Sequence, residues 1–507
     1  MNVRRWESAA AGVLSGLLFA LAFPPHNAAI LVPLALVPWI VALARESSLL
    51  RALFSGALFG MAFWCASVPW VSYVVTNYGG QSPVMGATCV VLLAVILAEW
   101  TAVVGWGTAV AGPPGSWRRF AAFPLLWAAA EHARSIAYGG FPWNLTGWAL
   151  ARRPIWTQTA SFWGVYGVGL AVAAVSALVA AFAVSRRPRP LAAAAILVVV
   201  LGVFGAARLA RPEDAGDARV VALIQPNLTE EDRGSPDVAA ESYRALLAQG
   251  AAAAAGRPDL VVFPESAFPL YWDRSPRLRA DLLAIAGACG CPVLFNDVTF
   301  EAGNTVSNAA RIVTPGGLAA GTYRKVHLVP FGEYVPLPKI FFFARRISQE
   351  IGEFTAAPEP VLLRAGPFVL GVGVCYEIIY PPLSRRQTAD GANLLATISN
   401  DSWYGRAGAQ EQHFAGAILR SVENGRYLVR SAITGISGAA DSRGRVFAEL
   451  PVHEAGTLRA RVRLLTERTA WTRWGHNLPF AADGAAVAML IFGLARRRIA
   501  RRDRAGR

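Results

Sequence analysis

Lysine is nearly missing from this chain. Of its 48 basic residues only two are lysines, Lys325 and Lys339. Arginine therefore serves almost wherever a positive charge is sufficient, and a retained lysine is a candidate for chemistry that a guanidinium cannot perform. An ammonium is a compact charge that fits beside a thiol and a carbonyl oxygen, whereas a guanidinium is planar and bulkier. For Lys325 the alternative is an ordinary surface lysine; for Lys339 we favour that alternative or a contact with a lipid headgroup.

Acidic residues are scarce in the first 210 residues, where only four occur: Glu7, Glu46, Glu99 and Glu131. The whole chain of 507 residues is 54% hydrophobic, with a mean hydropathy of +0.38. This composition is too apolar for an ordinary soluble protein of that length. Part of the chain therefore lies in a membrane.

Long hydrophobic runs locate the membrane part. A spanning helix needs roughly 20 mostly apolar residues. The sequence predicts eight such helices, at about 8–23, 29–44, 52–76, 84–111, 119–136, 156–184, 191–208 and 479–495. Seven of them form a helical region over 1–212, and the eighth precedes a basic tail at 496–507. A cleaved signal peptide is the alternative for the first, but Phe23-Pro24-Pro25 is a poor cleavage context.

The arginines predict the orientation of these helices. If the N-terminus is cytoplasmic, the inside loops carry most of them: Arg4, Arg5, Arg45, Arg51, Arg118, Arg119, Arg186, Arg187, Arg189 and the run from Arg496 to Arg507. The outside loops 24–28 and 78–83 carry none, and Arg152 with Arg153 is the one contrary pair. Both termini are then cytoplasmic and residues 218–465 lie outside. The net charge of +15 reflects this topology and anionic lipids, so nucleic acid is not expected as a partner.

Cysteine is also scarce, with five residues and no disulfide pattern. Cys65 and Cys89 fall on predicted membrane helices, where packing is their expected role. Cys289 and Cys291 are too close in sequence for an easy disulfide, and no histidine pair accompanies them as in a metal site. We therefore expect neither a disulfide nor a metal, and Cys375 remains as the cysteine of interest.

Residues 218–465 read as a globular domain of the α/β class. Apolar strands are predicted at 220–225, 259–263, 292–295, 368–374 and 394–399, and helices at 239–255, 276–288 and 410–424. Glu265 and Cys375 both come just after the end of a predicted strand. Strand ends in such sheets are where reactive groups gather.

Three motifs in this block carry a carboxylate, an ammonium and a thiol. They are Phe263-Pro-Glu-Ser-Ala-Phe-Pro269, Tyr323-Arg-Lys-Val-His327 and Gly371-Val-Gly-Val-Cys-Tyr-Glu377. These groups suit acyl transfer through a thioester, because a carboxylate can take the thiol proton and a fixed cation can stabilise the oxyanion. The alternatives are an inert core cysteine at 375 and a helix-capping glutamate at 265.

The Pro-Glu, Arg-Lys-Val-His and Cys-Tyr-Glu motifs resemble the nitrilase superfamily of Glu-Lys-Cys amidases. The membrane helices before the domain, the single helix after it, Phe331-Gly-Glu-Tyr-Val-Pro336 and Ser399-Asn-Asp-Ser-Trp403 are together similar to the apolipoprotein N-acyltransferase family. This resemblance implies an αββα sandwich on the periplasmic side of a bacterial inner membrane. One departure is Ile433, where we expect that family to carry an asparagine.

The resemblance also implies roles for the residues of the motifs. Glu265 would be the general base, Cys375 the nucleophile and Lys325 the group that stabilises the tetrahedral oxyanion. Glu333 would orient Lys325 or the incoming amine. Tyr376 and Glu377, which follow the nucleophile, would help to shape the site.

The implied reaction moves an acyl chain from a membrane phospholipid to Cys375, and then to the α-amino group of a diacylglyceryl-cysteine on an apolipoprotein. No metal, nucleotide or other cofactor is expected, because the ester already holds the acyl group in a transferable form. Phe341 to Phe343 suggest a lid that touches the bilayer, or else buried core. Two other functions stay open: a membrane-tethered amidase with water as the acceptor, and a transporter or receptor with an outside domain.

Overall fold

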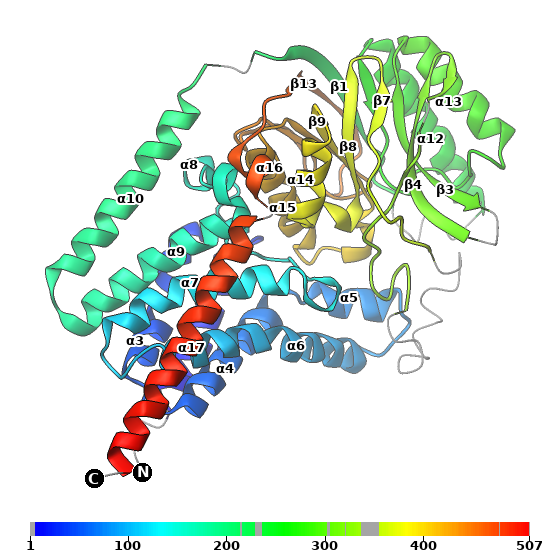
Figure 1. Ribbon diagram of the computed structural model, residues 1–507. Helices are drawn as coiled ribbons and strands as arrows, with labels where there is room; N and C mark the ends of the chain where they lie inside the picture. The colour runs from blue at the N-terminus through cyan, green and yellow to red at the C-terminus, as the bar shows by residue number, and fades with distance from the viewer. Residues whose placement is uncertain are drawn as a thin grey trace. The chain divides into compact units, whose positions relative to one another are not determined.

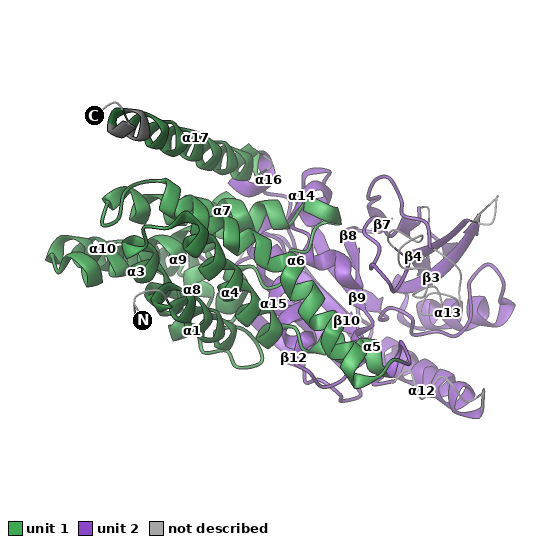
Figure 2. Cartoon of the chain, turned by 90° about the horizontal axis from the view of Figure 1, so that it is seen from below, with its two compact units in different colours: residues 1–76, 81–210, 474–507 green, residues 77–80, 211–473 purple. Residues whose placement is uncertain are grey.

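The computed structural model describes residues 6–212, 215–228, 236–301, 305–319, 321–335, 354–475 and 477–505. The chain forms two compact units (Figures 1 and 2). The first unit contains residues 1–76, 81–210 and 474–507, and the second contains 77–80 and 211–473. The first is helical, and the second carries the strands.

The helices of the first unit follow the predicted apolar runs. They are α1 (Glu7–Leu21), α2 (Val32–Ala35), α3 (Val37–Arg45), α4 (Leu49–Ser67), α5 (Trp70–Asn77), α6 (Pro83–Val110), α7 (Trp117–Arg134), α8 (Pro154–Thr157), α9 (Ala160–Ser185), α10 (Pro188–Leu209) and α17 (Asn477–Ala505). Five of them, α4, α6, α9, α10 and α17, are long and apolar enough to cross a membrane. The segments Glu7–Leu21 and Ala29–Arg45 are apolar but shorter. Helix α7 is not among the five, because it carries Arg118, Arg119, Glu131 and Arg134.

The expected single span 52–76 is wrong in one respect, because the structure divides it into α4 and α5. The break falls at Val68 and Pro69. Proline has no backbone N–H and its ring clashes with the carbonyl four residues earlier, so α4 ends and a new helix begins.

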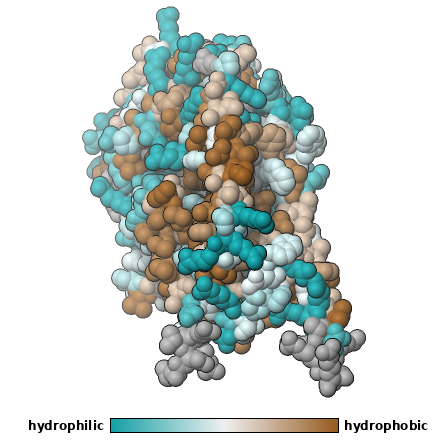
Figure 3. Space-filling model, turned by 90° about the vertical axis from the view of Figure 1, so that its left-hand side faces the viewer, coloured by the Kyte–Doolittle hydropathy of each residue, from teal (hydrophilic) through white to brown (hydrophobic). Residues whose placement is uncertain are grey.

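Small residues let α1, α4 and α6 pack closely. A Cβ added to Gly12 would lie 2.3 Å from the carbonyl oxygen of Ser55, and one added to Gly56 would lie 2.2 Å from that of Thr101. Without a hydrophobic driving force between helices in lipid, such close backbone approach supplies much of the packing attraction. Helix α10 exposes hydrophobic side chains, among them Ile196 and Val203. Figure 3 shows hydrophobic patches on one face of the molecule, separated by hydrophilic residues.

The second unit contains two sheets. Among the described residues the first sheet has the order β13-β1-β2-β3-β4-β5, with β6 paired to β4. Its strands are β1 (Asp217–Gln225), β2 (Leu260–Val262), β3 (Val293–Glu301), β4 (Thr305–Thr314), β5 (Gly317–Leu318), β6 (Tyr323–Arg324) and β13 (Gly456–Leu464). The second sheet has the order β12-β11-β10-β9-β8-β7. Its strands are β7 (Leu363–Ala365), β8 (Phe368–Val374), β9 (Leu394–Ser399), β10 (Leu428–Ala432), β11 (Ser437–Ala440) and β12 (Val446–Leu450).

Helices cover the outer face of each sheet. One buried apolar cluster joins the two sheets and includes Leu223 and Val374. A second cluster, which includes Leu246 and Leu282, seats α12 (Pro236–Ala255) and α13 (Pro276–Cys289) on the first sheet. Helices α14 (Pro381–Ala389) and α15 (Ala409–Asn424) pack against strands β8 and β10 of the second (Figure 1). These four layers confirm the predicted αββα sandwich.

The expectation that no disulfide forms is wrong. Cys289 and Cys291 are joined, with their Cα atoms 5.2 Å apart. Helix α13 ends at Cys289, and Gly290 caps it with a left-handed φ of 67°. This sharp turn brings the two side chains together, which sequence spacing alone did not reveal.

Candidate active site

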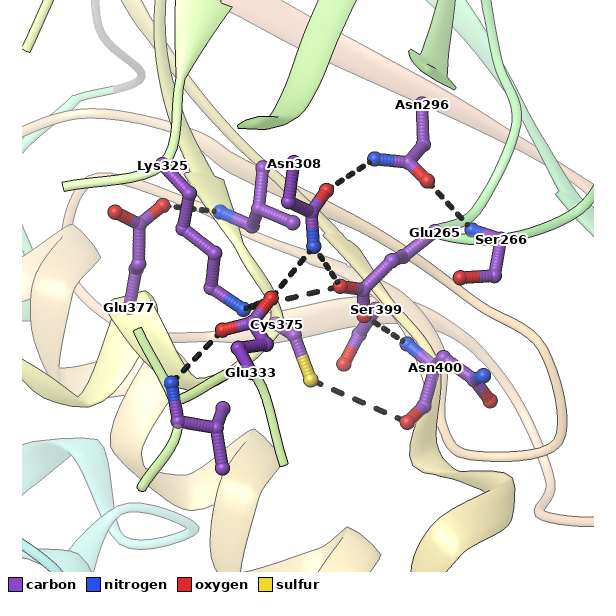
Figure 4. Close-up of polar contacts among 12 residues, drawn as sticks. Glu265, Ser266, Asn296, Asn308, Lys325, Glu333, Cys375, Glu377, Ser399 and Asn400 are labelled. Atoms are coloured by element: carbon purple, nitrogen blue, oxygen red, sulfur yellow. Dashed lines mark hydrogen bonds and ion pairs between the residues drawn. The ribbon is translucent and has the colours of Figure 1, made fainter. Parts of the chain in front are cut away.

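Glu265 lies at the strand end where the sequence expected it. Strand β2 ends at Val262, and the carboxylate of Glu265 follows in a buried position, with 8% of its side chain exposed. Its Oε1 accepts a hydrogen bond from Asn308 Nδ2 at 2.9 Å, and its Oε2 accepts one from the backbone N–H of Asn400 at 2.9 Å (Figure 4). Burial raises the pKa of Glu265, because the charged form loses its hydration. A carboxylate with a raised pKa is a stronger base than one in water.

Lys325 is buried beside two carboxylates. It follows the short strand β6, and its backbone N–H donates to the carbonyl of Asn308 at 2.8 Å. Its Nζ donates to Glu333 Oε1 at 2.9 Å and lies 3.8 Å from Glu265 Oε1. Burial alone would lower the pKa of Lys325, but the charges of Glu333 and Glu265 raise it above its ordinary value. The side chain is therefore an ammonium, and it is no surface lysine.

Cys375 stands on a strained turn at the end of strand β8. It is the first residue of the 3₁₀ helix η6 (Cys375–Ile379), and its φ is +52°. A non-glycine residue in this left-handed conformation is unfavourable, so the surroundings must hold it there. The thiol is buried, and Sγ lies 4.0 Å from the carbonyl oxygen of Asn400. Burial, and then the charge of Glu265, raise the pKa of Cys375, so the thiol holds its proton until a base removes it.

Figure 4 shows the three groups directed toward one another from three different chain segments. Electrostatic coupling agrees, because Lys325 lowers the pKa of Cys375 while Glu265 raises it. The arrangement offers a proton acceptor, a nucleophile and a fixed cation within one buried space. This set can carry out acyl transfer at a carbonyl carbon.

Glu333 is bound on both of its carboxylate oxygens. Its Oε1 accepts from Lys325 Nζ and, at 2.8 Å, from Asn308 Nδ2; its Oε2 accepts from the backbone N–H of Val329 at 2.8 Å. Through the amide of Asn308, Glu333 is linked to Glu265. The two carboxylates therefore hold Lys325 from two sides.

Glu377 links the backbone around Lys325 to the turn that carries Cys375. Its Oε2 accepts from Tyr323 Oη at 2.7 Å and from the Val374 N–H at 2.8 Å. Its Oε1 accepts from the Val326 N–H at 2.6 Å. Burial raises the pKa of Glu377 to about 7, although Lys325 and these donors favour the charged form. The neighbouring Tyr376 is buried, with its ring 5.5 Å from that of Tyr380.

Comparison with known proteins covers both units. Residues 15–178 match the apolipoprotein N-acyltransferase N-terminal domain, and residues 220–470 match the carbon-nitrogen hydrolase family. The apolipoprotein N-acyltransferase of Geobacter metallireducens is 34% identical over 496 residues, which is 95% of this chain and 94% of that protein. The chain belongs to the apolipoprotein N-acyltransferase family. As a member of this family it is an acyltransferase and a bacterial membrane protein.

A second curated relative agrees with that assignment. The apolipoprotein N-acyltransferase of Methylococcus capsulatus is 31% identical, with 95% of both chains covered. Among solved structures, an amidase from Nesterenkonia sp. is 20% identical with a TM-score of 0.38, over 49% of this chain and 92% of that one.

Ile433, the departure from the apolipoprotein N-acyltransferase pattern, has an apolar role. Its side chain is fully buried in the cluster that contains Ile224 and Phe263. Its backbone carbonyl accepts the N–H of Asn227 at 2.9 Å. Isoleucine therefore packs near the segment that carries Glu265 without a side-chain hydrogen bond.

Two asparagines that the sequence did not single out organise this candidate site. Asn308 in β4 holds both carboxylates, and Asn296 in β3 fixes Asn308 through a 2.7 Å bond from Nδ2 to Oδ1. Each lies in a strand that carries other polar residues, such as Asp297 in β3 and Ser307 in β4, so no local signal set these asparagines apart. A third, Asn400, lay in a recognised motif but without an assigned role.

Phe341 to Phe343, the suggested lid, and Lys339 lie outside the described residues. Within the described part of the chain, no group of three or more His, Cys, Asp or Glu side chains could hold a metal ion.

Proposed function

We propose that this chain transfers an acyl chain from a membrane phospholipid to the α-amino group of the N-terminal diacylglyceryl-cysteine of an apolipoprotein. In this proposal Cys375 carries the acyl group as a thioester. The observation that supports it most is the buried set of Glu265, Lys325 and Cys375, in which a protonated thiol lies beside a carboxylate of raised pKa and a fixed ammonium.

The first half-reaction acylates Cys375. Glu265 accepts the thiol proton, and Sγ attacks the ester carbonyl carbon of the phospholipid. The oxyanion that forms is stabilised by Lys325 Nζ. When the tetrahedral intermediate collapses, the C–O ester bond breaks and the leaving alkoxide takes the proton from Glu265. The products are a lysophospholipid and an acyl thioester.

The second half-reaction transfers the acyl group from Cys375 to the acceptor. The free amine of the diacylglyceryl-cysteine attacks the thioester carbonyl, Glu265 accepts a proton from the nitrogen, and Lys325 again faces the oxyanion. Collapse breaks the C–S bond, and the departing sulfur is protonated by Glu265. The amide product forms, and the enzyme returns to its starting state without a cofactor.

The other site residues support these steps in distinct ways. Glu333 orients Lys325 through its 2.9 Å contact. Glu377 holds the cysteine turn against the lysine segment through its four acceptor contacts. Tyr376 shapes the wall beside the nucleophile.

We further propose that residues 1–212 and 479–495 reside in the inner membrane, with residues 218–465 on its periplasmic side and 496–507 in the cytoplasm. The arginine distribution supports this orientation. A membrane-impermeant maleimide should label Ala245→Cys, on exposed α12, in intact spheroplasts. It should label Trp117→Cys, at the start of α7, only after permeabilisation. The reverse pattern would contradict both the orientation and the lipoprotein substrate.

The function is tested on lipoprotein N-termini in cells that depend on this chain. When the native protein is present, mass spectrometry should find N-terminal peptides with one additional acyl chain. When the Cys375→Ala variant replaces the native protein, these peptides should lack the additional acyl chain. Unmodified N-termini in the presence of the native, inserted protein would refute the proposal. If purified protein instead releases free fatty acid or cleaves amides at the same rate with and without acceptor, the amidase alternative holds.

A further inference from the structure

A second buried polar cluster contacts the backbone of the proposed nucleophile. It consists of Asp401, His413 and Arg430, which the 3₁₀ helix η7 (Asp401–Tyr404), helix α15 and strand β10 supply, and all three side chains are fully buried. The contact that joins this cluster to the nucleophile is made by His413, whose Nε2 lies 3.0 Å from the backbone carbonyl oxygen of Cys375.

The contact with Cys375 places a hydrogen on Nε2 of His413. A carbonyl oxygen only accepts, so Nε2 must donate to Cys375. On the other side of the ring, Nδ1 lies 3.1 Å from two groups: Arg430 Nη2, which only donates, and Asp401 Oδ1, which only accepts. Burial and then the charge of Arg430 lower the pKa of His413, which favours the neutral ring with its hydrogen on Nε2.

Asp401 holds this arrangement in place. Its Oδ2 accepts from Arg430 Nη2 at 2.5 Å, and its Oδ1 accepts from Ser399 Oγ at 2.6 Å. The same Oδ1 lies 3.1 Å from His413 Nδ1, so Asp401 also contacts the ring directly. Gly435 packs against it so tightly that an added Cβ would lie 2.1 Å from Oδ2. Arg430 is thereby fixed, and it in turn fixes the orientation of the His413 ring.

The cysteine turn is consequently held at both ends. The N–H of Val374, just before the nucleophile, donates to Glu377 at 2.8 Å. The carbonyl of Cys375, just after its strained φ of +52°, accepts from His413. Such a conformation persists only when surrounding contacts determine it, and these two contacts flank the strained bond.

We infer that His413 is a positioning residue for acyl transfer: its Nε2–H, oriented by Arg430 and Asp401, fixes the carbonyl of Cys375 and so aims the thiol at the acyl carbon. The inference rests on the proposed role of Cys375 as the nucleophile. It assigns His413 to the geometry of attack and not to the ionisation of the thiol.

The test uses the full chain in phospholipid nanodiscs, in a background in which Cys65 and Cys89 are alanine. The variants are His413→Phe, which keeps a ring without the donor, and His413→Gln, whose amide nitrogen reaches the position of Nε2. Ser421→Ala is the matched control, because it removes a buried hydrogen bond (Oγ to the Ile418 carbonyl, 2.7 Å) on the same helix. Two rates are measured for each: acylation of Cys375 by phospholipid, and alkylation of Cys375 by iodoacetamide as a function of pH.

His413→Phe should slow acylation by about 10- to 100-fold, because misplacement of a reacting atom is that costly. Its alkylation profile should keep the native midpoint, since a small reagent does not need the aligned approach. His413→Gln should recover most of the acylation rate, and Ser421→Ala should be native-like.

Three results would overturn the inference: native acylation in His413→Phe, no recovery in His413→Gln, or a shifted alkylation midpoint. If His413→Phe does not fold, His413→Gln is compared with His413→Asn, whose amide is too short to reach the carbonyl; equal rates would overturn the inference. Failure of the proposed function is distinct, because the native protein itself would then form no adduct.

Discussion

Two buried charged sites, one in each unit of this protein, use charge in opposite ways. In the helical unit, Arg119 is almost fully buried and donates to backbone carbonyls, at 2.5 Å to Leu43 and 2.6 Å to Glu46. In the α/β unit, Lys325 Nζ is bound by the carboxylates of Glu333 and Glu265. Glu265 also accepts from one backbone N–H, and both Glu265 and Lys325 act electrostatically on the Cys375 thiol. The Arg119 guanidinium, bonded to carbonyls, stabilises the packing of chain segments. The Glu265 and Lys325 pair instead presents charge to a reacting group. Burial of a charge alone therefore does not mark a reactive site; its partners do.

The largest effect should come from Glu265→Gln, which keeps the shape of the side chain but removes its basicity. Acylation of Cys375 should fall by about 10²- to 10⁴-fold, the usual contribution of a positioned base. Single-turnover acylation by phospholipid measures this, with Glu359→Gln, an exposed carboxylate paired to Arg386, as the control. Native turnover in Glu265→Gln would mean that the buried carboxylate is structural.

The same residue predicts a pH dependence. Only the carboxylate form of Glu265 can accept the thiol proton, and burial raises its pKa above the ordinary 4.5. Acylation should therefore be slow at low pH and should increase as pH rises through that raised pKa. Glu265→Gln should lose this acid limb; its retention would assign the titration to another group.

Lys325→Arg should have the next largest effect, although it preserves the charge. A guanidinium cannot occupy the compact space beside Glu333 and Glu265, so the oxyanion loses its donor, which costs about 10²-fold or more. The measurement is the acylation rate of protein that is shown by its melting temperature to be folded. An activity close to native would remove Lys325 from the mechanism.

Asn308→Ala should have a smaller effect, because it loosens the two carboxylates without removing them. Loss of hydrogen bonds to charged groups of about 1.5–3 kcal/mol each predicts a decrease of about tenfold or more in the acylation rate. Asn393→Ala is the matched control, since Asn393 also has a buried amide, bonded at 2.8 Å to the carbonyl of Pro367. Equal losses in both variants would indicate a general packing defect.

Arg119→Met should affect turnover least. This variant tests whether the buried charge in the helical unit is structural. The carbonyls that Arg119 binds would lose their donor, at about 1–3 kcal/mol for each buried group. The thermal midpoint should therefore fall while the acylation rate per folded molecule stays native. A specific loss of turnover at unchanged stability would show that buried charge in the helical unit also serves the chemistry.

Much of the fold could be predicted from sequence because apolar runs and strand patterns are local signals. The bounds of α6 and β8 fall within one residue of the predicted runs. Errors arose where a single residue decides the local backbone. Pro69 divides an apolar run that is continuous in composition, and Gly290 turns the chain so that Cys289 and Cys291 meet.

The site was predictable only in part, for a similar reason. Lys325 and Cys375 attracted notice because lysine and cysteine are rare here and because both fall in recognisable motifs. Asn308 and His413 did not, since their roles arise from contacts between distant segments. Asn308 reaches both carboxylates because the first sheet has the order β2-β3-β4 and β6 also pairs with β4, and no local pattern reveals that arrangement.

The covalent intermediate tests the central claim most directly. Protein incubated with phospholipid and no acceptor should gain the mass of one acyl chain at Cys375, and neutral hydroxylamine should remove it because the bond is a thioester. Cys375→Ala should gain nothing, and an acceptor with a free diacylglyceryl-cysteine amine should discharge the native adduct faster than water does. If folded native protein forms no adduct at Cys375 with any phospholipid, the thioester mechanism is wrong.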